Sequence, residues 1–120
     1  MTDRRELESA MQIDRLVEGN TVVTVVKGRL DSSSSPRLDE MLAVIPDGST
    51  AVLLDFEELT YISSAGLRVV LKAAKLARSS SVALAVCSLT PQVHEVFEVS
   101  GFSSLIPIHQ SRETALASFT

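Results

Sequence analysis

The chain has 120 residues, of which 45% are hydrophobic and 22% charged, and its formal net charge is -4. A chain of this length forms one domain and can bury roughly two-thirds of its unfolded surface, so a second core and a disordered chain are both excluded. The negative net charge argues against a nucleic-acid partner, because neutralising phosphates requires clustered Lys and Arg in excess.

The single cysteine, Cys87, cannot form an internal disulfide, and no apolar run approaches the roughly 18 residues that span a bilayer. We therefore expect a protein of the reduced cytoplasm that does not insert into membranes. Residues 1–10 are polar and carry charges of both signs, which predicts a flexible lead-in before a single domain at residues 11–120. Nothing in the sequence demands more than a monomer.

The first predicted elements are the two strands of an antiparallel hairpin. Residues 11–18 alternate imperfectly between apolar and polar side chains, and residues 21–30 are rich in β-branched side chains. Gly19 and Asn20 between them supply the turn.

A helix and then a buried strand are predicted next. Ser35 is expected to cap the helix, Pro36 suits its first position, and residues 46–48 (PDG) end it. Residues 51–56 (AVLLDF) form a short continuous apolar run, which is typical of a strand covered on both faces.

The second half of the chain alternates between helix and strand. Apolar spacing and end signals predict a helix at 64–78, a strand at 82–87, a helix at 90–101, an edge strand at 105–108 and a helix at 111–119. The sum is an α/β fold, with a mixed, mostly parallel sheet of about five strands, an N-terminal β-hairpin and about four helices.

Signals for catalysis and for metal or cofactor binding are weak. His94 and His109 stand far apart and no glycine-rich phosphate loop is present, so we expect neither a metal nor a cofactor. Ser64 and Gly66 match half of the nucleophile elbow of serine hydrolases, but Ile62 occupies a position that requires a small residue. We expect no enzymatic activity and no catalytic residue.

Two hydroxyls, those of Ser63 and Ser64, stand where the chain passes from a buried strand into the next helix. One interpretation is capping of the helix, a position that serine favours. The other is a phosphorylation site, because the free amides and the positive dipole end of a helix N-terminus stabilise a phosphoryl group.

Three segments carry a resemblance to a known family: residues 63–67 (SSAGL) at a helix start, residues 28–31 (GRLD) at the end of the hairpin, and residues 88–102, a late helix ending in Ser-Gly and an apolar residue. In order and spacing they resemble the STAS domain family, specifically the bacterial anti-sigma factor antagonists. The resemblance covers nearly all of the chain after residue 10 and implies a single STAS-like domain.

By this resemblance, Ser64 is the regulatory serine. An anti-sigma factor with serine kinase activity would phosphorylate it, and a metal-dependent serine phosphatase would restore it. The unphosphorylated protein would bind the kinase and free the sequestered target, and phosphorylation would reverse this. Two residues depart from the family's pattern: Ser63 replaces the usual acidic residue and is a rival acceptor, and Ala65 replaces a second hydroxyl.

The partner-binding surface that the resemblance implies lies at the start of this helix and the end of the hairpin. It comprises Asp31, Ser63, Ser64, Ala65, Gly66, Leu67, Arg68 and Lys72. Two other interpretations stay open: Asp31 could cap its own loop, and Arg68, Lys72 and Lys75 could form a solvated helix face. An alternative function is that of a STAS scaffold subunit, never phosphorylated, in a signalling or membrane-transport assembly. The serine at position 63 favours that alternative.

Overall fold

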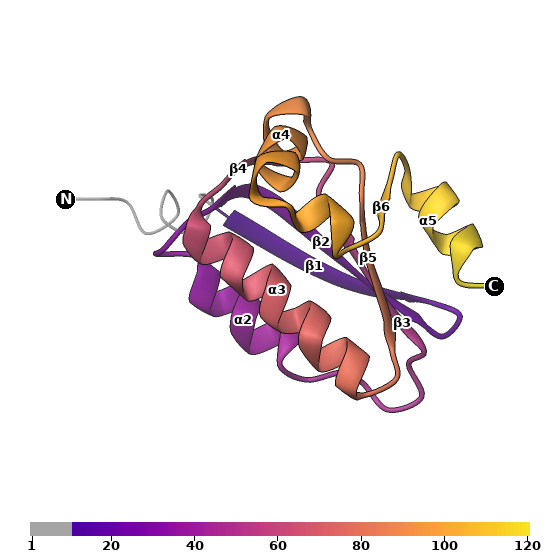
Figure 1. Cartoon of the computed structure of the whole chain (residues 1–120). Helices are drawn as coiled ribbons and strands as arrows, with labels where there is room; N and C mark the ends of the chain where they lie inside the picture. The colour runs from indigo at the N-terminus through magenta and orange to yellow at the C-terminus, as the bar shows by residue number, and fades with distance from the viewer. Residues whose placement is uncertain (1–10) are drawn as a thin grey trace.

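A mixed six-stranded sheet forms the centre of the molecule in a computed structural model, which describes residues 11–120 (Figure 1). The predicted lead-in at residues 1–10 lies outside this range. The strands are β1 (Met11–Glu18), β2 (Thr21–Leu30), β3 (Ala51–Asp55), β4 (Leu59–Ile62), β5 (Ala83–Cys87) and β6 (Ile108–His109). The helices of residues 11–120 are α2 (Ser35–Leu42), α3 (Ser64–Ser79), α4 (Pro91–Ser100) and α5 (Arg112–Ser118), with a short 3-10 helix, η1, at Phe102–Ser104.

The predicted α/β architecture is confirmed. β1 and β2 form an antiparallel hairpin that runs from the pair Met11 and Gly28 to the pair Glu18 and Thr21. The remaining pairings are parallel and give the strand order β1-β2-β3-β5-β6, with β4 paired to β2 away from that path. Parallel neighbours require crossover connections, which the helices provide.

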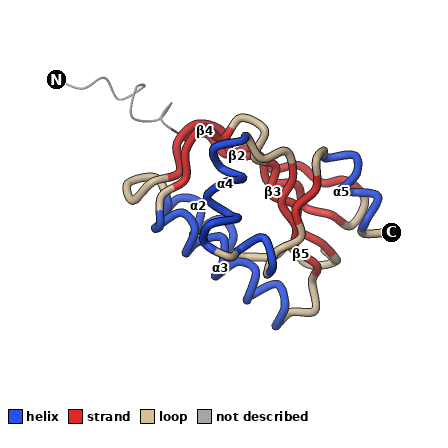
Figure 2. The backbone as a smooth tube through the Cα atoms, turned by 45° about the horizontal axis from the view of Figure 1, so that its top comes forward, coloured by secondary structure: helices blue, strands red, loops and turns tan. Residues whose placement is uncertain are grey.

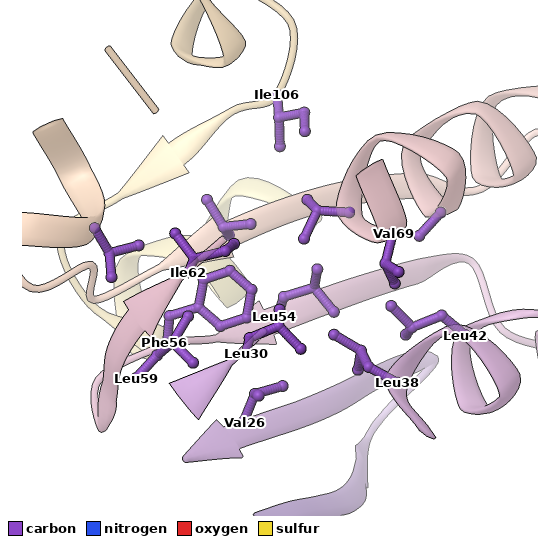
Figure 3. Close-up of a cluster of buried hydrophobic side chains, with 14 of the residues drawn as sticks. Val26, Leu30, Leu38, Leu42, Leu54, Phe56, Leu59, Ile62, Val69 and Ile106 are labelled. Carbon is purple, nitrogen blue, oxygen red and sulfur yellow. The ribbon is translucent and has the colours of Figure 1, made fainter. Parts of the chain in front are cut away.

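The two faces of the sheet are covered by unequal layers. α2, α3 and α4 pack on one face over the larger hydrophobic core, which includes Leu54 and Phe56 (Figure 3). α2 and α3 lie side by side along this face (Figure 1). α5 covers the other face over a smaller cluster that includes Leu53 and Ala115 (Figure 2).

β3 is the central strand, and all five of its residues are buried, as the apolar run predicts. Side chains alternate along a strand, so Val52 and Leu54 join the larger core and Leu53 joins the smaller one. Asp55 ends the strand, and its Oδ2 accepts a hydrogen bond from Nε of Arg112 at 2.9 Å. A buried carboxylate needs such a partner, so this ion pair ties α5 to the sheet.

β4 was not predicted from the sequence, and it makes the sheet six-stranded rather than about five-stranded. Only its ends, Leu59 and Ile62, are buried, so it lacks the apolar run of β3. β2 is longer than β3 and pairs with it only over Thr21 to Val25. β4 pairs with residues 28–30 at the remaining end of β2, and the register of this pairing shifts between Gly28 and Arg29.

Several predicted boundaries shift, most of them by one residue, and the larger shifts are those of α2 and β6. The N-cap of α2 is Ser34, with no capping hydrogen bond from its side chain, and Ser35 is the first helical residue, whose hydroxyl donates to the carbonyl of Asp31. α2 ends at Leu42, before the predicted stop at residues 46–48. The last strand is β6, which begins just after Pro107 instead of at residue 105, and it lies at the sheet edge as predicted.

Candidate functional site

The candidate site lies where β4 passes into α3, beside the end of β2. The backbone N–H of Ser63 donates to the carbonyl of Leu30 at 2.9 Å, which fixes the connection against β2. A Cβ added to Gly66 would lie 2.8 Å from Cγ of Leu30 and 2.9 Å from Cγ1 of Ile62 (both labelled in Figure 3). Gly66 is buried, so it does not contact a partner directly. Its missing side chain allows α3 to approach the sheet closely.

Ser63 is the N-cap of α3. Its backbone is extended, with φ -91° and ψ 173°, and its Oγ accepts a hydrogen bond from the N–H of Gly66 at 3.2 Å. This is the geometry in which a serine satisfies one of the free amides of a helix start. The hydroxyl of Ser63 is therefore engaged in holding the helix.

Ser64 differs from its neighbour in position and exposure. It is the first residue of α3 and is exposed, whereas Ser63 is half-buried. No acidic residue stands in the first turn of the helix, so the positive end of the dipole is not offset there by a side chain of that turn. The structure thus presents Ser64 to solvent at a helix terminus that favours negative charge.

Asp31 follows the end of β2 and organises the turn into α2. Its Oδ1 accepts hydrogen bonds from the N–H of Ser33 at 3.0 Å, the hydroxyl of Ser33 at 2.8 Å and the N–H of Ser34 at 3.1 Å. The hydrogen bond from the Ser33 hydroxyl is the largest of the causes that hold the pKa of Asp31 below its usual value. The loop-capping interpretation is confirmed, and a partner contact of this half-exposed residue stays a prediction.

The three basic residues of α3 that could form a solvated helix face, Arg68, Lys72 and Lys75, have different surroundings. Nζ of Lys72 lies 3.2 Å from a carboxylate oxygen of Asp39, so this lysine joins α3 to α2. Arg68 and Lys75 are exposed and form no ion pair with the acidic side chains of residues 11–120. Ala65 and Leu67 are half-buried, and Leu67 packs against the larger core.

Two side chains beside the site were not predicted. The guanidinium of Arg29, near the end of β2, lies 4.2 Å from the ring centroid of Tyr61 on β4. Tyr61 is 41% exposed and borders a hollow between β4 and α4 that is also lined by Gln92 and Val96. Had β4 been predicted as a strand, the alternation of its side chains would have indicated that Tyr61 is exposed beside the two serines.

The remaining reactive side chains do not combine with Ser64. His94 and His109 line a separate hollow between α4 and β6, which does not include Ser63 or Ser64. Burial raises the pKa of the Cys87 thiol to about 11, which leaves it protonated at neutral pH. Within residues 11–120, no three His, Cys, Asp or Glu side chains come together as a metal site would need.

No helix of this range has both the length and the apolar character for crossing a membrane.

A family model for the STAS domain matches residues 12–115. The chain belongs to the STAS domain family. Among its curated relatives, BtrV of Bordetella bronchiseptica, named as an anti-sigma factor antagonist, is 44% identical over 99 residues, which span 82% of this chain and 85% of that protein. The predicted family is therefore confirmed.

Solved structures share this STAS fold over most of its length. An anti-sigma factor antagonist from Mycobacterium paratuberculosis superposes with a TM-score of 0.83 at 18% identity, covering 91% of this chain and 93% of that one. The Bacillus cell fate determinant SpoIIAA in its phosphorylated form superposes with a TM-score of 0.70 at 22% identity, covering 92% of this chain and 100% of that one. Both likenesses concern the fold.

Proposed function

We propose that this STAS protein is an anti-sigma factor antagonist that acts by partner switching through Ser64. Unphosphorylated, it binds an anti-sigma factor with serine kinase activity, and the sequestered sigma factor goes free. Phosphorylation of Ser64 breaks this complex, and a metal-dependent serine phosphatase regenerates the binding form. The observation that carries the proposal is the exposed hydroxyl at the first position of α3.

The chemistry of the switch belongs to the partner, and this chain is substrate and ligand. The kinase transfers the γ-phosphoryl group of ATP, so that a bond forms between Oγ of Ser64 and phosphorus while the bond to the departing ADP breaks. The hydroxyl proton passes to a base of the kinase. ATP therefore binds to the kinase, and no cofactor belongs to this protein.

A phosphate on Ser64 is expected to leave the fold intact. It adds about -1.5 to -2 charges at neutral pH, which the free amides and the dipole of the α3 N-terminus stabilise. The same charge, buried against a docked partner, must lose its water or meet like charges. A penalty of about 3 to 4 kcal/mol would weaken the complex several-hundred-fold, so no large motion is required.

Ser64 is the better acceptor of the two adjacent serines. The Oγ of Ser63 caps the helix through Gly66, and a phosphate there would have to give up or distort that hydrogen bond. Ser64 has no such capping role and is the more exposed of the pair. The bound partner would cover this helix start, the exposed Arg68 beside it, and Asp31 at the end of β2.

The competing proposal is a scaffold subunit that is never phosphorylated, and Ser63 in place of the family's acidic residue favours it. Mass spectrometry of the protein isolated from cells, grown with and without stress, separates the two. A phosphate on Ser64 in any condition supports the switch. Its absence in every condition, including strains that lack the serine phosphatases, would contradict the switch and favour the scaffold.

A further inference from the structure

Arg68 stands four positions after Ser64 on α3, and both residues are exposed. Side chains at this spacing lie on the same face of a helix, with Cβ atoms roughly 5–6 Å apart. An anion that precedes a cation by four residues is the more favourable order, since it also suits the helix dipole. A phosphate on Ser64 would lie within reach of the Arg68 guanidinium.

Other cations around the helix start are already engaged within residues 11–120. They are Lys72 with Asp39, Lys27 with Glu58 at 3.3 Å, and Arg29 over the ring of Tyr61. Arg68 forms no such pair with the acidic groups of this range. The carboxylate of Asp31, which follows the Leu30 that meets Ser63, adds a negative charge to the same region. A counter-charge would therefore add to the stabilisation that the helix terminus gives a phosphate there, and Arg68 is the cation placed to supply it.

We propose that Arg68 is the intramolecular counter-ion of a phosphate on Ser64, an inference that rests on the proposed phosphorylation of that residue. The planar guanidinium offers two parallel N–H donors to phosphate oxygens, a pairing stronger and more directional than that of an ammonium group.

The proposal gives phosphorylation two effects on the binding surface. In the unmodified protein, the exposed guanidinium of Arg68 is available to an acidic side chain of the partner. In the phosphorylated protein, it is bound to the phosphate of its own chain. Phosphorylation then adds a repulsive charge and at the same time withdraws an attractive one from the surface.

The test uses the full chain with phosphoserine incorporated at position 64 during translation, so that no kinase is needed. Phosphorus NMR follows the titration of the phosphate's second proton. We expect its pKa to be about half a unit lower with Arg68 than in Arg68→Ala, because a cation one turn away stabilises the dianion. Arg68→Lys should recover only part of this shift, since its ammonium lacks the paired donors.

Arg78→Ala is the matched control. It removes an exposed arginine side chain from the same helix, at a position roughly 21 Å from Ser64 along the axis and beyond the screening length of about 8 Å at physiological salt. It should leave the phosphate pKa unchanged. If Arg68→Ala titrated like the parent and like Arg78→Ala, the counter-ion proposal would be wrong.

The experiments distinguish a failure of the counter-ion proposal from a failure of the proposed switch. A phosphate pKa that responds to Arg68, in a protein whose phosphorylation leaves kinase binding unchanged, would keep the counter-ion and remove the switch. A phosphate pKa insensitive to Arg68, in a protein whose kinase binding collapses on phosphorylation, would keep the switch and remove the counter-ion.

Discussion

Two serine-bearing segments lead from the sheet into the neighbouring helices α2 and α3, and their hydroxyls have different fates. In residues 31–35, which lead from β2 into the first residue of α2, Ser34 and Ser35 are buried. The hydroxyl of Ser34 donates to the carbonyl of Arg29 at 2.8 Å, and that of Ser35 donates to the carbonyl of Asp31. At residues 63–64, between β4 and α3, one hydroxyl caps the helix and the other is exposed.

The difference shows that serine content does not make a modification site. The first segment carries four consecutive serines, yet Ser33, Ser34 and Ser35 hold the turn together through hydrogen bonds to Asp31 or its neighbours. A single capping serine suffices for the start of α3, which leaves Ser64 without a capping role. Adding charge is therefore expected to affect binding at the second segment and stability at the first.

The largest expected effect is on partner binding. Ser64→Asp should weaken the complex with the cognate kinase at least several-fold and up to several-hundred-fold, the loss expected for the phosphate, while its melting temperature changes little. Ser64→Ala should bind constitutively. Isothermal titration calorimetry measures both.

Ser32→Asp is the control that compares the segments, because Ser32 is exposed and lies in the first of them. We expect it to change the affinity less than tenfold. If it weakened binding as much as Ser64→Asp, general surface charge would explain the effect, and the two segments would not differ in function.

Gly66→Ala is expected to destabilise the fold by about 2 kcal/mol, because the new Cβ would overlap Leu30 and Ile62. The free-energy cost of this overlap exceeds the gain in helix propensity from glycine to alanine. Urea denaturation measures the change. A stability equal to or above that of the parent would show that the start of α3 can move away from β2 at no cost, and that the exposure of Ser64 is not fixed by this contact.

The two adjacent serines should differ in stability as they do in geometry. Ser63→Ala removes the cap of α3 and should cost about 1 kcal/mol, whereas Ser64→Ala should stay within about 0.5 kcal/mol of the parent. Ser63→Asp keeps a good capping group and should restore the stability. Equal losses in Ser63→Ala and Ser64→Ala, measured by thermal and urea denaturation, would contradict the assignment of the cap.

The smallest effect concerns Asp31 and pH. The pKa of its carboxyl is lowered in the folded protein, so its ionised form stabilises the fold above the unfolded pKa of about 3.9, and this contribution is lost as pH falls through the folded value. The stability difference between the parent and Asp31→Asn should be below about 1 kcal/mol at pH 7 and smaller at pH 3. If the stability difference between the two proteins grew as the pH fell, the conclusion that ionised Asp31 stabilises the fold would be wrong.

Much of this protein was determined by local sequence. The apolar run of β3, the turn at Gly19 and Asn20 and the helical spacing of α3 each specify a local structure, and the structure confirms them. The position of Ser63 and Ser64 at a helix start could also be predicted, because capping preferences act within a few residues. These features depend on neighbours in the chain, so the chain itself reveals them.

Tertiary structure decided the rest. β4 is a strand because the end of β2 is left unpaired beyond β3, and its own four residues carry little strand signal. Gly66 is required by Leu30, and Lys72 meets Asp39 across two helices, in both cases through contacts more than 30 residues apart in sequence. The hydrogen bond from Ser63 to Leu30 of β2 sets where α3 begins, and this decides that Ser63 caps the helix while Ser64 is exposed. Contacts between distant segments form only when the chain folds, so no local sequence pattern predicts them.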